Sequence, residues 1–215
     1  MKAKVKGRYE AHESNASVTL SVNLGRDLVV RTTMANATLT RGPSLTGLEL
    51  SLHNPNSFNL RYDVPKKDIR LQFTNKITLM DKTVRFAYNH AHRENQTSIE
   101  GSTAFDQSNR VRVYYDFGSG NLKVKYVYAY GFMGRTTVEP CYDVCKNAWG
   151  FALLKKLDGG DFVKATYNAS DKDLGLEWKR KSKGNGSFKI SASLNLTEQC
   201  RVPKLKAEST WNYEI

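Results

Sequence analysis

The sequence predicts an all-β fold, a closed antiparallel transmembrane β-barrel with about 12–14 strands. Three observations support this fold class. Apolar and polar residues alternate with a period of two along almost the whole chain, which is typical of β-strands. Clusters of Gly, Asn, Asp and Pro interrupt the alternation at short intervals, as hairpin turns do. No stretch of the chain approaches the roughly 18 apolar residues that a membrane helix needs.

The first two segments show the pattern most clearly. Residues 2–10 place apolar side chains on one face and Lys or Arg on the other, and residues 16–24 alternate apolar residues with Ser, Thr and Asn. The residues between them, 13–15, have the length and composition of a hairpin turn. The sequence therefore predicts that the chain begins with an antiparallel hairpin.

The alternation continues to the C-terminus. The further predicted strands lie in segments 28–34, 48–52, 58–64, 69–73, 84–88, 110–117, 122–128, 188–196 and 205–215. The predicted turns lie at 25–27, 54–56, 118–121, 159–161, 171–173 and 184–186. The best candidate for a helix is segment 145–157, but its apolar residues also alternate. We expect residues 1–215 to form a single barrel domain.

The expected number of strands follows from the chain length. Sequential hairpins with short turns leave exposed sheet edges unless the sheet closes on itself. A strand with its turn takes about 14–16 residues, so the chain predicts about 13–15 strands, and an even number is usual. The segments counted along the chain reach about sixteen, but short neighbours such as those within 45–64 form one strand or two, and we favour 12–14 strands in total.

Three features favour a membrane barrel over a soluble one. The candidate strands have about nine to eleven residues, the length that a tilted spanning strand needs, whereas ordinary strands have about five to six. They are too many for an eight-stranded ligand-binding barrel, whose interior could not hold so many Leu, Tyr and Phe side chains. Aromatic residues also lie near segment ends, as in an interfacial girdle. These residues are Tyr9, Tyr88, Phe105, Phe117, Tyr130, Trp211 and Tyr213.

The free-energy cost of placing a charged side chain in lipid determines whether the charged face of each strand points to lipid or to the lumen. If the first strand slipped by one residue, its lysines and arginine would face lipid at about 2–4 kcal/mol each at mid-depth. The charged face is therefore predicted to line a water-filled lumen. The predicted lumen residues are Lys2, Lys4, Lys6, Arg8, Arg31, Arg61, Arg70, Arg85, Arg112, Lys123, Lys125, Lys164, Lys189, Lys206, Glu177 and Glu208.

The charge balance predicts a net positive lumen. The chain has 33 Lys and Arg against 21 Asp and Glu, a formal net charge of +12. Rings of basic side chains favour anions and phosphates. A wide lumen weakens this preference, because salt with a Debye length of about 8 Å screens the wall. We expect weak selectivity, with anionic metabolites passing.

Other functions have less support in the sequence. The basic faces would suit a nucleic-acid-binding protein, but oligonucleotide-binding barrels have about five strands. A soluble all-β carrier is the main alternative to a membrane barrel. Cys141 and Cys145 lack partners at metal-binding spacing, and His90 and His92 have no evident third ligand. The sequence contains no motif typical of an enzyme, and we expect no catalytic residues, cofactor or metal.

Several motifs, taken in their order along the chain, resemble one protein family. They are Met1-Lys2-Ala3, Gly42-Pro43-Ser44-Leu45, Val64-Pro65-Lys66-Lys67-Asp68, Glu139-Pro140-Cys141-Tyr142-Asp143-Val144, residues 185–193 and the ending from Pro203 to Asn212. Together they resemble the 24-kDa outer envelope pore protein family of plant chloroplasts over the whole chain.

The resemblance implies a β-barrel solute channel in the outer membrane of the plastid. It implies a high-conductance, voltage-dependent and weakly selective pore for triose phosphates, phosphate, dicarboxylates, sugars, ATP and charged amino acids. The implied partners are membrane lipid and the metabolites and ions in transit, and the family description includes homo-oligomers. From the residues themselves we expect no nucleic-acid partner. The family is described as slightly cation-selective, which conflicts with the net positive lumen. The family also lacks a cleavable transit peptide, which agrees with the first residues here, since they show no Ser- and Arg-rich amphipathic segment.

Overall fold

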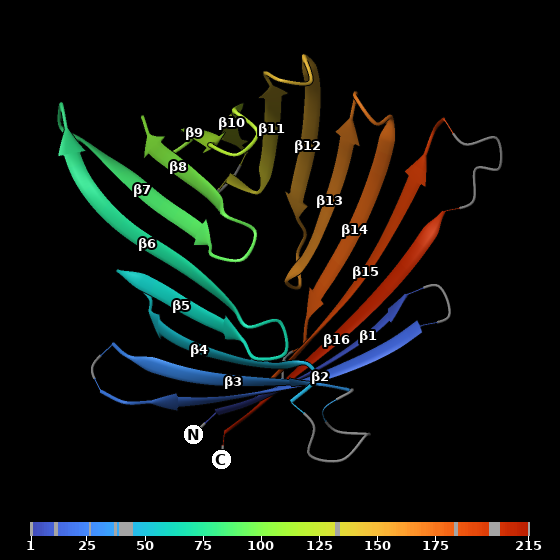
Figure 1. The fold of residues 1–215 in the computed structure, drawn as a ribbon. Helices are drawn as coiled ribbons and strands as arrows, with labels where there is room; N and C mark the ends of the chain where they lie inside the picture. The colour runs from blue at the N-terminus through green and yellow to red at the C-terminus, as the bar shows by residue number, and fades with distance from the viewer. Residues whose placement is uncertain are drawn as a thin grey trace.

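The computed structural model describes residues 2–10, 13–25, 27–36, 38, 45–131, 134–182, 185–197 and 203–214. These residues form sixteen β-strands around a closed barrel (Figure 1). Each strand pairs antiparallel with its neighbours in the sequence, and β1 pairs with β16 to close the ring. The predicted fold class, an all-β closed antiparallel barrel, is confirmed.

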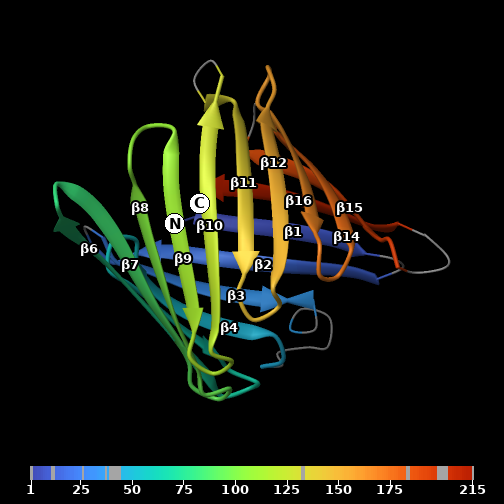
Figure 2. The same ribbon diagram turned by 90° about the horizontal axis from the view of Figure 1, so that it is seen from above.

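The sixteen strands follow one another along the chain. Their bounds are β1 Lys2–Glu10, β2 Glu13–Asn23, β3 Val29–Ala35, β4 Leu48–Asn54, β5 Phe58–Asp63, β6 Asp68–Leu79, β7 Lys82–Ala91, β8 Gln96–Ala104, β9 Asn109–Asp116, β10 Asn121–Tyr130, β11 Thr136–Asp143, β12 Ala148–Lys156, β13 Asp161–Asn168, β14 Asp173–Lys181, β15 Gly186–Asn195 and β16 Lys204–Glu214. Viewed after a 90° turn, β8 to β12 run side by side (Figure 2).

The prediction of 12–14 strands was too low. Strands β3, β4 and β5 have only 7, 7 and 6 residues, fewer than the nine to eleven assumed for a spanning strand. The segments within 45–64 form two strands, because a tight turn at 55–57 separates β4 from β5. In that turn the backbone N–H of Asn56 donates to the side-chain oxygen of Asn54 at 3.1 Å.

The candidate helix at 145–157 is instead a turn followed by β12. Trp149, Phe151 and Leu153 share the outer face of this strand, which explains their alternation. In the described part of the chain, no helix is long and apolar enough to cross a membrane. Some sequence features, namely His12, Arg26, residues 42–44, Gly184 and Cys200, lie outside the described residues.

The two ends of the barrel differ. The terminal rim carries Lys2 of β1 and Glu214 of β16, so both chain ends lie there (Figure 1). The opposite rim carries a repeated four-residue turn, at 64–67, 92–95, 117–120, 144–147 and 169–172. The last residue of each turn has a positive φ; these residues are Lys67, Asn95, Gly120, Asn147 and Lys172. This left-handed residue lets the next strand return antiparallel beside its predecessor.

The barrel has no dry apolar interior. Among the described residues, Ala3 is the only buried hydrophobic residue, and large apolar side chains on nearly every strand are exposed. In β10, for example, Val124, Tyr126 and Tyr128 are exposed, whereas Lys123 and Lys125 form ion pairs on the other face. A soluble carrier would instead bury its Leu, Tyr and Phe side chains in the interior of the barrel. The observed arrangement fits a barrel whose outer face meets lipid.

Aromatic side chains gather near both rims, as predicted for a girdle. Phe105, Tyr130 and Trp211 lie at the terminal rim, whereas Tyr9 and Phe117 lie at the opposite rim, and all five are 48–53% exposed. Tyr213 also lies at the terminal rim. Tyr88 lies three residues from the end of β7, as Trp211 does in β16, so it is also near a rim.

Candidate functional site in the barrel lumen

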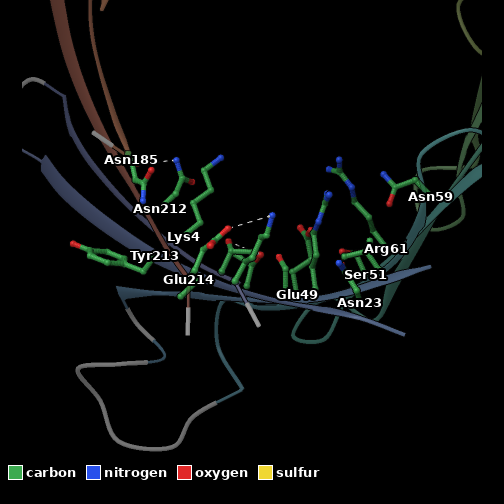
Figure 3. Close-up of a pocket in the computed structure, with 17 residues that line it drawn as sticks. Lys4, Asn23, Glu49, Ser51, Asn59, Arg61, Asn185, Asn212, Tyr213 and Glu214 are labelled. Atoms are coloured by element: carbon green, nitrogen blue, oxygen red, sulfur yellow. Dashed lines mark hydrogen bonds and ion pairs between the residues drawn. The ribbon is translucent and has the colours of Figure 1, made fainter. Parts of the chain in front are cut away.

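The strand register defines the inner face of the barrel. Residues directly opposite each other on neighbouring antiparallel strands point to the same side of the sheet. One such row on the inner face runs through Lys2, Ser21, Arg31, Ser51, Arg61 and Arg70. Lys4, Glu49 and Arg61 rise from the wall into the same space (Figure 3).

The register places all sixteen predicted lumen residues on this inner face. Lys2, Lys4, Arg31 and Arg61 line a recess of about 800 Å³. Further recesses are lined by Arg85 and Arg112, by Arg70, and by Lys164, Glu177 and Lys206. The remaining members, which are Lys6, Arg8, Lys123, Lys125, Lys189 and Glu208, form ion pairs in the wall.

Glu208 is the centre of an ion-pair cluster where the barrel closes. Its carboxylate lies 3.1 Å from Lys6 Nζ and 3.9 Å from both Lys189 Nζ and Arg8 Nε. Lys189 also reaches Glu177, at 3.2 Å. These contacts connect β14, β15, β16 and β1, so the predicted lumen charges also hold the closing strands together.

Two ion pairs on β10 and β11 show how the wall presents its charge. Lys123 Nζ lies 3.1 Å from Asp143, and Lys125 Nζ lies 3.5 Å from Glu139. The lysine is the more exposed partner in each pair, 42% against 14% in the first. Solute in the lumen therefore meets the ammonium groups before the carboxylates, and the accessible surface here is more positive than the charge count alone implies.

Sequence analysis missed both of these carboxylates. Glu139 and Asp143 lie on β11, which contains Pro140, and a proline within a run weakens a strand prediction. The signal was present, because Thr137, Glu139, Cys141 and Asp143 alternate with apolar residues. It also missed Lys76, because the segment at 69–73 extends as β6 to Leu79.

A third group of ion pairs lies on β6, near the opposite rim. Arg70 Nε donates to Asp68 at 3.0 Å, and Arg70 Nη2 donates to Glu94 at 3.1 Å. Asp68 is almost completely buried and also accepts the backbone N–H of Arg93 at 3.0 Å. This carboxylate therefore ties the start of β6 to the β7–β8 turn and also fixes the direction of Arg70.

Other cations of the inner face remain unpaired. Within the described part of the chain, no carboxylate lies within ion-pair distance of Lys4, Arg31, Arg61, Arg85, Arg110, Arg112 or Lys164. Their charge is free to attract anions from water.

The predicted cysteine and histidine features give no metal site in the residues that the structure describes. Cys141 and Cys145 are free thiols. His90 Nδ1 lies 2.9 Å from the Thr97 hydroxyl, and the His90 and His92 rings meet edge-on with their centroids 6.4 Å apart. No group of three or more His, Cys, Asp or Glu side chains in these residues is placed to hold a metal ion.

Comparison with known protein families shows to which family this chain belongs. The family model described as outer envelope pore protein 24 matches residues 1–214. The chain belongs to the outer envelope pore protein 24 family. It is similar to the chloroplastic outer envelope pore protein 24B of Arabidopsis thaliana, with 44% identity over 100% of this chain and 99% of the relative. It is also similar to the chloroplastic outer envelope pore protein 24 of Oryza sativa subsp. indica, with 45% identity over 100% of both.

Solved porin structures share the fold. A mutant of the Rh. blastica porin has a TM-score of 0.58 at 7% identity, with 99% of this chain and 98% of the porin covered. Salmonella typhi OmpF has a TM-score of 0.57 at 10% identity, covering 99% and 96%. Like its outer envelope pore protein 24 relatives, the chain is a pore protein of the chloroplast outer envelope, and its family and its porin-like barrel support a channel function.

Proposed function

We propose that this chain is a high-conductance, voltage-dependent and weakly selective diffusion channel. In this proposal triose phosphates, phosphate, dicarboxylates, sugars, ATP and charged amino acids cross the outer envelope through its water-filled lumen. The sixteen predicted lumen residues form the polar lining along which these solutes move.

The closed sixteen-stranded ring with charged side chains on its inner face carries this proposal. Barrels of 16 to 18 strands are too wide for their own side chains to fill, and they leave an aqueous channel. A chain with apolar side chains outside and unpaired arginines inside therefore supports passage of polar solutes rather than storage of one ligand.

The proposal includes weak selectivity. Ion pairs such as Lys6–Glu208 and Lys123–Asp143 offset part of the positive charge of the wall. The remaining cations are exposed to water, where salt screens them beyond about 8 Å at physiological ionic strength. Anionic metabolites are thus admitted without exclusion of neutral or cationic ones.

Refolded protein in a planar bilayer tests the proposal. We expect large single-channel conductance steps that close at high voltage, and a small reversal potential in a salt gradient. Liposome swelling with a triose phosphate, succinate and glucose measures whether charged and neutral solutes pass. Absence of conductance from protein with the heat-modifiable gel mobility of a folded barrel would contradict the proposal.

Homo-oligomerisation stays a prediction of the family resemblance. Light scattering of the refolded protein in detergent measures the number of chains, and a strictly monomeric mass would contradict it.

A further inference from the structure

One recess of the inner wall holds a concentration of arginine side chains. This arginine recess has a volume of about 390 Å³ and is lined by Arg85 of β7 and by Arg110 and Arg112 of β9. Thr83 and Ser102 add hydroxyl groups, and Glu100 is the one carboxylate among the lining residues. Three guanidinium groups against one carboxylate give the recess a net positive charge.

The strand register makes this part of the wall electrostatically unfavourable when nothing is bound. Lys76 lies directly opposite Arg85, and Arg112 lies directly opposite Lys125. Like charges directly opposite each other destabilise a sheet. Lys125 is compensated by Glu139, but in the described residues no carboxylate forms an ion pair with Arg85, Arg110 or Arg112.

The strand register places all three arginines close together on the inner face. Arg85 and Arg112 lie on either side of Ser102, each directly opposite it. Neighbouring strands are about 4.8 Å apart, so these two arginines start roughly 10 Å apart. Arg110 lies one inner-face position away, opposite Ala104. Long arginine side chains can therefore converge on a compact anion above the Ser102 hydroxyl.

We propose that the arginine recess is a transient binding station for phosphate monoester dianions inside the lumen. This inference rests on the proposed channel function and adds a defined site to it. The planar forks of arginine match phosphate oxygens bidentately, and a compact dianion offsets the repulsion among the cations. The recess opens to the lumen, so binding is weak and the solute leaves again, as conduction requires.

A compact phosphate fits this geometry better than a dicarboxylate. A phosphate monoester presents its double charge on one tetrahedral group, which two or three guanidinium groups can contact at once. A dicarboxylate such as succinate carries its two charges on separate groups. The recess should therefore saturate with glycerol 3-phosphate at lower concentration than with succinate.

Single-channel conductance of the full chain tests the station. Conductance is measured with increasing glycerol 3-phosphate, succinate or chloride as the anion at constant ionic strength. The test variant is Arg85→Gln/Arg110→Gln/Arg112→Gln. The matched control is Lys4→Gln/Arg31→Gln/Arg61→Gln, which removes three unpaired cations from a different recess. A second variant, Arg85→Lys/Arg112→Lys, keeps the charge and removes the fork.

We expect the wild-type current to saturate with glycerol 3-phosphate. The concentration for half-saturation should rise about tenfold or more in the Gln variant of the arginine recess, by a smaller factor in the Lys variant, and little in the matched control. A linear wild-type current, or equal shifts in the two triple variants, would overturn the station while leaving the channel intact. A wild-type barrel without any current would instead refute the proposed function itself.

Discussion

At the scale of single residues, neighbours in one strand of this barrel meet opposite environments. Ile190 of β15 lies on the outer face and is 38% exposed, whereas Lys189 beside it forms an ion pair with Glu177 inside. The two positions are separated by one peptide unit, yet one contacts lipid and the other water. Substitution effects should therefore depend on which face a residue occupies more than on its position in the sequence.

The adjacent pair Ile190 and Ser191 tests this dependence. Ile190→Lys places a charge on the lipid face near the middle of β15 and should lower the free energy of unfolding by about 2–4 kcal/mol. Ser191→Lys, on the inner face opposite Glu177 and Lys206, is the matched control and should change it by less than about 1 kcal/mol. Urea unfolding in lipid vesicles, followed by tryptophan fluorescence, measures both. Equal destabilisation would contradict the assignment of the two faces.

A substitution at Glu208 tests how the wall carboxylates offset the positive charge of the lumen. Its side chain is only 15% exposed and serves several cations, so Glu208→Gln leaves Lys6 and Lys189 without this carboxylate. We expect a reversal potential shifted toward anion selectivity and a loss of about 1–3 kcal/mol in unfolding free energy. Glu214→Gln, at a 79% exposed rim position, is the control and should cost less than about 1 kcal/mol. An unchanged reversal potential would show that Glu208 does not influence the permeating ions.

At the scale of elements, the hairpin turns carry their own stabilising contacts. In the β8–β9 turn, Asp106 accepts the backbone N–H groups of Ser108 and Asn109, both at 2.7 Å, and the Asn109 side chain at 2.6 Å. These donors, led by the Asn109 side chain, lower the pKa of Asp106 below its ordinary value. The turn is therefore favoured while Asp106 is ionised.

The depressed pKa of Asp106 predicts how this turn responds to acid. Its contribution to stability is complete above the unfolded-state pKa of about 3.9 and is lost as the pH falls through the lower folded value. Asp106→Asn should thus be less stable than wild type at pH 7, with the difference shrinking below about pH 4. Thermal unfolding across this range measures the difference.

A matched control for the turn is Asp81→Asn, in the β6–β7 turn of the same rim. Within the described residues Asp81 makes no hydrogen bond or ion pair. The variant removes a carboxylate from the same rim without removing such contacts, so at pH 7 it should lose less stability than Asp106→Asn. If the Asp106→Asn difference stayed constant down to pH 2, the hydrogen bonds to Asp106 would not be the cause.

At the scale of the whole molecule, closure of the sheet into a ring creates a property that no single strand has. Pairing of β1 with β16 removes both sheet edges, so every strand has two neighbours. Closure also gathers inner-face cations from the entire chain around one volume of water. The field of the lumen is thus a property of the assembled ring rather than of any one segment.

This collective field predicts a dependence on ionic strength. The Debye length falls from about 8 Å at 0.15 M salt to about 3 Å at 1 M. Any preference of the lumen for anions should therefore be larger in dilute salt and should decline as salt rises. Reversal potentials at a fixed concentration ratio and increasing total salt measure it. A preference that does not change with salt would point to a narrow constriction instead of the charged wall.

Much of the fold and the inner-face assignment could be predicted from local patterns. The alternation of Lys2, Lys4, Lys6 and Arg8 with apolar residues predicted their common face, because side chains alternate across every strand. The number of strands could not be predicted as well. The turn at 54–56 was predicted, but strands β3, β4 and β5 are shorter than the nine to eleven residues assumed for a spanning strand, so an estimate from chain length gave too few strands.

The sequence by itself determined that this chain is a series of β-strands with an apolar side and a basic side, since alternation and turn chemistry are local. Only the tertiary structure decided which cations lie together. Arg85 and Arg112 become neighbours of Ser102, and Lys6 and Lys189 meet at Glu208, through strand register and ring closure. Register depends on pairing between segments that are distant in the chain, so no single segment encodes which charges meet in the lumen.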